Sequence, residues 1–88
     1  MLNCVLNNKC IQFELDSGAS VSTIGKIDAD RIGADIKPSN KKIIGYGGND
    51  VPVEGEMTAK FHYCNATFYH TFVVIKSNSV NLLGCDIC

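Results

Sequence analysis

One acidic residue, Asp16, closes an apolar run in the segment FELDSGASVSTI and is followed directly by Ser17 and Gly18. Carboxyl groups act as general acids and bases in hydrolysis. Two carboxyl groups that meet cannot both ionise easily and share a proton, so one can activate a water while the other donates to a carbonyl. The chain holds one such loop, so this chemistry would need a second copy. The alternative is an ordinary turn or cap Asp at the end of a strand.

A glycine-rich segment, IIGYGGNDVPV, is the second feature that could serve a site. Gly45, Gly47 and Gly48 surround Tyr46, and glycine permits positive φ and a close approach of the backbone to a ligand. The segment lacks the Lys and the Ser or Thr of a phosphate-binding loop, and no helical pattern follows it. We therefore predict the tip of a mobile hairpin that acts as a lid, with a plain hairpin turn as the alternative.

Alternation of apolar and polar residues predicts that most of the chain forms strands that position these two segments. The clearest alternation runs from Val51 to Tyr63, where one face is apolar and the other is polar. Turns are predicted at Asn7–Lys9 and Cys64–Ala66. The predicted strands cover residues 2–6, 11–15, 51–63, 67–75 and 80–84.

A single segment, KIDADRIG, suggests a helix. Its apolar spacing suits about two turns, with Ser22 or Thr23 as a cap and Gly33 at its end. The predicted fold class is therefore all-β, with short strands and one minor helix.

The composition limits the classes of function. The 88 residues, 45% hydrophobic and 19% charged, fit one small soluble domain. The net charge is −1 and no basic block stands out, which argues against nucleic acid as the main partner. No apolar run approaches the ~20 residues of a membrane span. The first residues do not form the pattern of a secretory leader.

The five cysteines predict free thiols in a reducing, intracellular compartment. Cys85 and Cys88 form a single C-x-x-C, which supplies half of a zinc site at most. No second pair or histidine cluster completes it, so packing or chance is the preferred interpretation. We predict no metal and no other cofactor.

Three features in this order, the DSGA loop, IIGYGGNDVPV and VNLLGCD, resemble the retropepsin family. These are the homodimeric aspartic proteases of retroviruses and retrotransposons. The resemblance spans nearly the whole chain and looks closest to the gypsy-class retrotransposon branch, where a short helix often follows the active-site loop. It implies a single retropepsin-like domain over residues 1–88, a small all-β half-barrel with one short helix and a flap hairpin.

The resemblance also implies a role for each matching residue. Asp16 would be the catalytic aspartate, Ser17 would brace the two loops across the dimer, and Gly18 would hold the substrate backbone through its carbonyl. The other matches form the floor of the cleft, the tip of the flap and the apolar pocket walls: Ala19, Ser20 and Val21; Gly45, Tyr46 and Gly47; Val80 and Leu82.

The implied function is an aspartic endopeptidase, active as a homodimer, that cleaves the polyprotein containing it. Its location would be the cytoplasm or virus-like particles. Ser20 and Cys85 stand where many retroviral members pair an acid with an Arg, so both partners of that pair are absent. The terminal interface strands of the family look missing, so we expect a monomer or weak dimer with feeble activity. The alternative is a retropepsin-like binding or dimerisation module.

Overall fold

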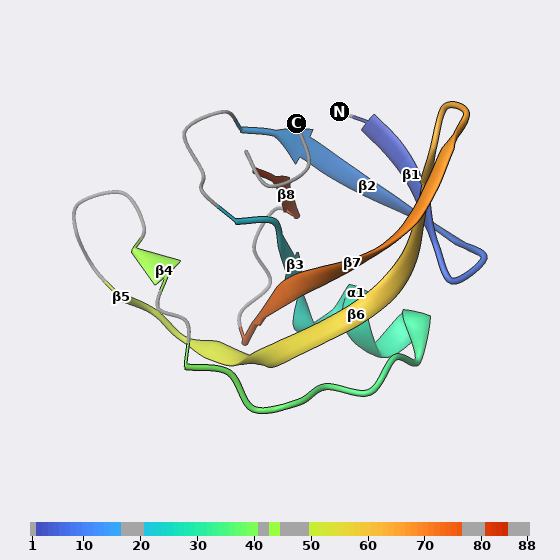
Figure 1. Ribbon diagram of the computed structural model, residues 1–88. Coiled ribbons are helices and arrows are strands. Elements are labelled where there is room, and N and C mark those ends of the chain that lie inside the picture. The colour runs from blue at the N-terminus through green and yellow to red at the C-terminus, as the bar shows by residue number, and fades with distance from the viewer. Residues whose placement is uncertain (1, 17–20, 41–42, 45–49, 77–80, 85–88) are drawn as a thin grey trace.

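The structure, a computed structural model of the chain, describes residues 2–16, 21–40, 43–44, 50–76 and 81–84 (Figure 1). Most of these residues lie in strands and one segment forms a helix, so the predicted all-β class with one short helix is confirmed. The elements within these ranges are β1 (Leu2–Leu6), β2 (Lys9–Leu15), β3 (Thr23–Gly25), α1 (Lys26–Ile32), β4 (Ile43–Ile44), β5 (Asp50–Val51), β6 (Val53–Tyr63), β7 (Ala66–Ile75) and β8 (Leu82–Leu83). In this part of the chain, no helix is both long enough and apolar enough to span a bilayer.

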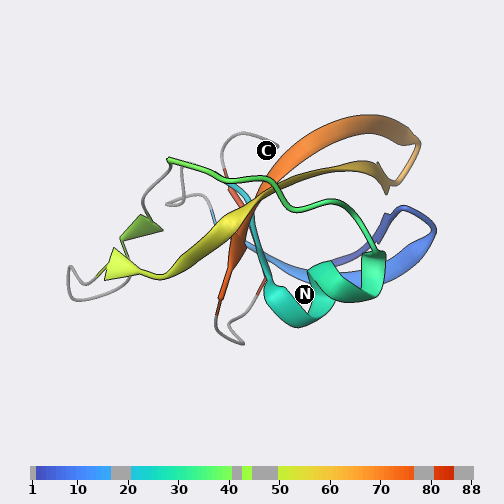
Figure 2. The same cartoon turned by 90° about the horizontal axis from the view of Figure 1, so that it is seen from below.

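Six strands form a closed barrel in the order β1-β2-β8-β3-β7-β6. Antiparallel pairing of Val5 with His62 and of Leu6 with Phe61 joins β1 to β6. The sheet is therefore more completely closed than the predicted half-barrel. β4 and β5 form a separate ribbon that projects from the barrel near the start of β6, as Figures 1 and 2 both show.

The turn between β1 and β2 follows from two asparagines. Asn7 and Asn8 have φ of 49° and 71°, and two-residue hairpin loops of type I′ need positive φ at both central positions. Asparagine tolerates this conformation better than most residues. The Asn7 side chain also accepts a hydrogen bond from the Lys60 N–H (2.9 Å), which ties the turn to β6. The predicted turn at residues 7–9 is confirmed.

The hydrophobic core includes side chains from β1, β2, β3, α1, β6, β7 and β8. The alternation predicted for β6 is confirmed, because Met57, Ala59 and Phe61 are all buried. The ring of Phe13 from β2 lies 6.5 Å from the ring of Phe61 and 5.7 Å from that of Phe72, measured between centroids. Aromatic pairs attract one another at such separations. The three rings fix β2, the strand that leads to Asp16, against the β6–β7 hairpin.

The helix α1 begins three residues later than a cap at Ser22 would give, and two residues later than a cap at Thr23 would give. Its N-terminal cap residue is Gly25, which makes no side-chain capping bond, and its C-terminal cap is Gly33 with φ of 76°. Gly33 as the end is confirmed, since glycine adopts the left-handed conformation without strain. The predicted cap is wrong because Ser22 and Thr23 are buried between strands of the barrel.

Residues 34–40 cross the outside of β6 after the helix (Figures 1 and 2). Lys37 and Glu56 exchange two backbone hydrogen bonds of 2.8 Å. The approach is so close that a Cβ at Gly55 would lie 2.3 Å from the carbonyl oxygen of Lys37. The predicted single strand over residues 51–63 is interrupted at Pro52, which has no N–H to donate to a ladder.

Candidate active site

Asp16 follows β2 directly and is partly exposed. β2 and β8 are parallel, with Glu14 opposite Leu82 and Leu15 opposite Leu83. The backbone N–H of Asp16 continues this ladder by donating to the carbonyl of Leu83 (3.0 Å). The acidic residue is therefore held in place by a strand from the opposite end of the sequence.

Ser22 follows residues 17–20 and Val21 in the sequence, and its hydrogen bonds join it to two other parts of the barrel. This residue is fully buried, and its Oγ accepts a hydrogen bond from the N–H of Gly84 (3.0 Å). Its carbonyl accepts from the N–H of Val73 in β7 (3.0 Å). Asp16 and Ser22 thus bind consecutive residues, Leu83 and Gly84. We call these two hydrogen bonds the loop clamp, because they tie Asp16 and Ser22, which flank residues 17–20, to the β8 segment.

Three of the predicted site residues lie in the described part of the chain. In the β2–β8 pair, Leu82 lies opposite Glu14, which is two residues before Asp16 in the sequence, and Leu82 also pairs with Thr23 of β3. Val21 directly precedes Ser22 of the loop clamp, and both Val21 and Leu82 are half-buried. The remaining predicted site residues lie outside the described residues: Ser17, Gly18, Ala19, Ser20, Gly45, Tyr46, Gly47 and Val80.

The predicted lid falls on the β4–β5 ribbon. Ile43 lies opposite Val51 and Ile44 opposite Asp50, in antiparallel register. Residues 45–49 connect the two strands and lie outside the described residues. The pairing agrees with a hairpin that has the glycine-rich segment at its tip.

Comparison with known proteins identifies the family. The sequence model of the family described as aspartyl protease matches residues 2–87, almost the full length. The chain belongs to the aspartyl protease family. No curated protein matched it.

Solved structures show which fold this chain shares. EIAV protease complexed with the inhibitor HBY-793 superimposes with a TM-score of 0.85 at 22% identity, over 98% of this chain and 81% of that chain. A retropepsin-like aspartic protease from Rickettsia conorii superimposes with a TM-score of 0.74 at 25% identity, over 98% of this chain and 67% of that chain. The retroviral protease-like domain of Ddi1 from Leishmania major superimposes with a TM-score of 0.71 at 21% identity, over 97% of this chain and 70% of that chain. The retropepsin-like fold is confirmed, whereas the gypsy-class branch stays a prediction.

Among the described side chains, no group of three His, Cys, Asp or Glu residues could hold a metal ion. Cys4, Cys10 and Cys64 are free thiols, and burial raises the pKa of Cys4. Cys85 and Cys88 lie outside the described residues.

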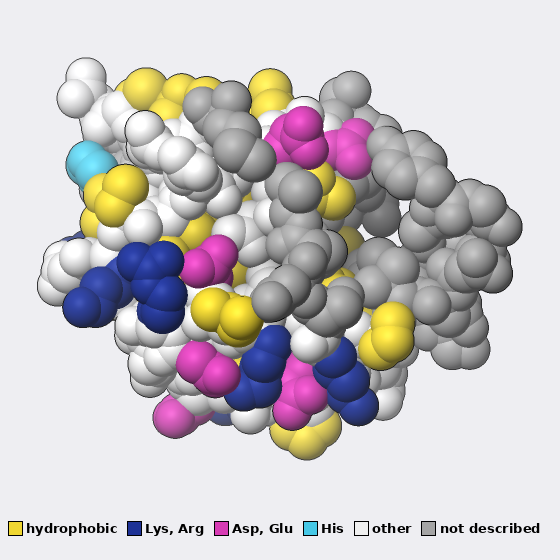
Figure 3. All heavy atoms as spheres, turned by 180° about the vertical axis from the view of Figure 1, so that it is seen from behind, with side chains coloured by type: hydrophobic (Ala, Val, Ile, Leu, Met, Phe, Trp, Pro, Cys, Tyr) yellow, Lys and Arg dark blue, Asp and Glu magenta, His cyan; other side chains and the backbone are white. Residues whose placement is uncertain are grey.

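On the face seen in Figure 3, basic and acidic side chains are interspersed rather than gathered into a patch of one charge.

Sequence reasoning missed the structural roles of two buried polar residues, Ser22 and Asn81. Asn81 is 6% exposed and directly precedes β8. A polar residue within an apolar segment such as VNLLG is costly to bury unless it is hydrogen-bonded. That contrast was a usable signal for Asn81, but its partners are far away in the sequence. Ser22 gave no comparable signal, because the preference of serine for helix caps favoured another interpretation of this residue.

Proposed function

We propose that this aspartyl protease is an endopeptidase in which Asp16 acts together with Asp16 of a second copy of the chain. The observation that supports this most directly is the loop clamp, which ties Asp16 at the end of β2 and Ser22 before β3 to consecutive residues of the β8 segment. The sequence holds one such Asp-Ser-Gly loop. Hydrolysis by a carboxyl pair needs one group as base and one as acid. The second carboxyl group then comes from a second copy.

The proposed reaction needs no covalent intermediate. The ionised carboxyl group of one Asp16 takes a proton from water, and the water oxygen bonds to the scissile carbonyl carbon. The protonated carboxyl group of the other Asp16 donates to the carbonyl oxygen. As the resulting tetrahedral diol collapses, one of its hydroxyl groups gives its proton to the ionised carboxyl group and becomes the new C=O, the C–N bond breaks, and the amine nitrogen takes a proton from the protonated carboxyl group. One water is consumed, and the shared proton returns to the two carboxyl groups.

An exposed apolar side chain beside Asp16 supports association of two copies. Leu15, the residue before the acid, is 59% exposed. In a two-fold symmetric dimer the same patch is used on both copies, so an approach that brings the two acids together also covers Leu15. Full burial of a leucine side chain contributes about 1.5–3 kcal/mol. The homodimer is therefore favoured at the same place where the chemistry needs it.

The substrate of the proposed enzyme is an extended polypeptide. Such a peptide would lie between the β4–β5 hairpin, acting as a flap, and the loop after β2, adding its backbone as a strand. Closure of the flap would exclude water and place the scissile bond. Val21 and Leu82 supply apolar surface for its side chains. We propose the polyprotein that contains this chain as the natural substrate, cleaved in the cytoplasm or in virus-like particles as in gypsy-class retrotransposons.

Cleavage of a library of long apolar peptides between about pH 4 and pH 7 tests the activity. Asp16→Asn removes the ionisable group and keeps the size of the side chain, and we expect a rate loss of at least about a hundredfold. Asp30→Asn is the matched control, since Asp30 is an exposed acid on α1, and its rate should equal that of the unaltered chain. Retention of activity by Asp16→Asn would contradict the mechanism. No cleavage by the unaltered chain would favour the binding-module alternative.

A further inference from the structure

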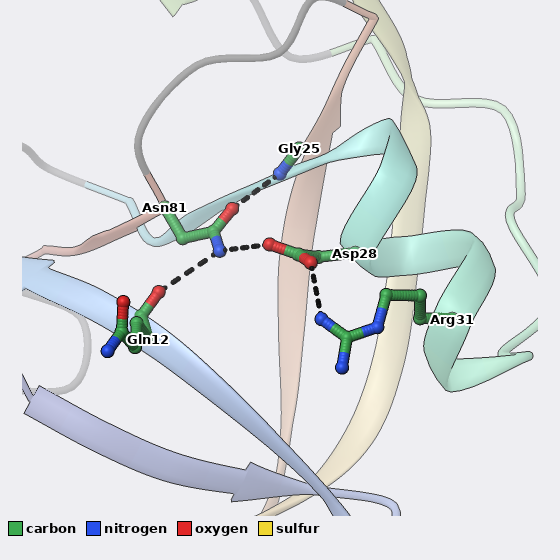
Figure 4. Close-up of polar contacts among 5 residues, drawn as sticks. All are labelled: Gln12, Gly25, Asp28, Arg31 and Asn81. Atoms are coloured by element: carbon green, nitrogen blue, oxygen red, sulfur yellow. Dashed lines mark hydrogen bonds and ion pairs between the residues drawn. The ribbon is translucent and has the colours of Figure 1, made fainter.

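One buried side chain, Asn81, joins three elements to β8 (Figure 4). Its Oδ1 accepts a hydrogen bond from the N–H of Gly25 at the end of β3 (2.7 Å). Its Nδ2 donates to the carbonyl of Gln12 in β2 (3.1 Å) and to Oδ2 of Asp28 in α1 (2.7 Å). Its backbone carbonyl accepts from the N–H of Glu14 (2.8 Å). The residue that begins the β8 segment is thus fixed from several sides.

Asp28 completes the bonding of this amide. A side-chain amide has two N–H donors and a carbonyl oxygen with two lone pairs. Here Gln12 and Asp28 accept from the two donors, and Gly25 donates to the oxygen. The other oxygen of Asp28 accepts from Nη1 of Arg31 (3.1 Å), which holds the carboxylate in its orientation. Asp28 is 29% exposed at its side chain, whereas Arg31 is 58% exposed. The network therefore runs from the surface of α1 to the buried start of β8.

The position of β8 decides the position of Asp16. β8 is two residues long, Leu82–Leu83, and offers few ladder bonds of its own. Leu83, whose carbonyl binds the Asp16 N–H, lies two positions after Asn81. A shift of Asn81 relative to β2 would therefore move the acceptor of the Asp16 N–H. Small displacements of reacting groups lower the reaction rate strongly, because bound substrate reacts only when the reacting atoms are held at the right distance and orientation.

We propose that Asn81 and Asp28 form a positioning pair that places Asp16 through β8. Neither residue touches substrate in this proposal, and both act through the Leu83–Asp16 hydrogen bond. The effect of the pair on catalysis rests on the proposed function, whereas its effect on the Asp16 backbone does not.

Hydrogen exchange of single amides tests the pair without any assay of activity. Asp28→Ala removes an acceptor from Asn81, whereas Asp28→Asn keeps a carbonyl oxygen that can accept the same bond. Asp30→Ala is the matched control, because it removes an acid from the same helix that pairs with Lys26 (2.7 Å) and not with Asn81. The three variants separate loss of the Asn81 bond from loss of charge on α1.

The expected result is local. The reference is the N–H of Glu56 in β6, which donates to the carbonyl of Lys37. In Asp28→Ala, the ratio of the exchange rate of the Asp16 N–H to that of the Glu56 N–H should rise at least about tenfold. Asp28→Asn and Asp30→Ala should leave this ratio within about twofold. If the exchange rates of the Asp16 and Glu56 amides rise equally in Asp28→Ala, or if neither changes, the proposal is overturned. If Asp28→Ala does not fold, Arg31→Ala frees Asp28 from its ion pair, and the absence of a selective rise at Asp16 would overturn it equally.

Kinetics add a second readout. We expect Asp28→Ala to lower kcat about tenfold with KM changed less than about twofold, and Asp28→Asn to restore most of the loss. A loss that Asp28→Asn does not restore would overturn the positioning pair. Absence of cleavage by the unaltered chain would contradict the proposed function and not the positioning pair. The ratio of the Asp16 to Glu56 exchange rates would then be the only test of the pair.

Discussion

Replacing Ser22 by Ala removes one hydroxyl group from the loop clamp. The Oγ of Ser22 is the acceptor for the N–H of Gly84 (3.0 Å), and both residues are buried. Alanine occupies nearly the same volume, so the main cost is a buried N–H left without this acceptor, about 1–3 kcal/mol. For a domain of this size, a loss of about 2 kcal/mol lowers Tm by roughly 8–16 °C.

Thermal unfolding followed by circular dichroism measures this loss. All variants are compared at one protein concentration, because association shifts Tm. Ser39→Ala is the control, since Ser39 is half-buried and its Oγ donates to Glu56 (3.2 Å) away from the clamp. The control should lower Tm by less than about 4 °C. A Ser22→Ala variant with the Tm of the unaltered chain would refute the role given to this hydroxyl group.

Two further predictions concern other parts of the fold. Gly55→Ala should destabilise by about 3 kcal/mol or more, because the new Cβ would lie 2.3 Å from the backbone oxygen of Lys37; an unchanged midpoint in urea would contradict this. The hydrogen bond from Lys26 to Asp30 raises the pKa of Lys26 above its ordinary 10.5. Its contribution is complete below the unfolded-state pKa and disappears as pH rises through the higher folded-state pKa. The stability difference from Asp30→Asn should therefore shrink at alkaline pH, and urea midpoints that diverge there would exclude the assignment.

Local signals in the sequence were sufficient for much of the barrel. The alternation in β6 placed Met57, Ala59 and Phe61 inward because a strand has a period of two. The asparagines of the β1–β2 turn have intrinsic access to positive φ. Gly33 ended the helix for the same kind of reason. Asp16 was located at the end of β2 because the apolar run before it stops there.

Long-range contacts could not be predicted in the same way. Asn81 bonds to Gln12, Gly25 and Asp28, and such partners are chosen by the tertiary fold. Ser22 looked like a helix cap because the local preference of serine for caps is strong, but the strand pairing of β3 outweighed it. Closure of the barrel by β1 and β6 depends likewise on pairing between distant strands.

The most direct test of the central claim, that catalysis needs Asp16 from two copies, is a mixing experiment. Unaltered chain and Asp16→Asn are unfolded together, refolded at a fixed total concentration and assayed for peptide cleavage. If both acids are required and the chains pair at random, activity follows the square of the unaltered fraction, so an equal mixture retains about a quarter. A linear decline, with about half of the activity left in the equal mixture, would show that one Asp16 suffices and would contradict the account.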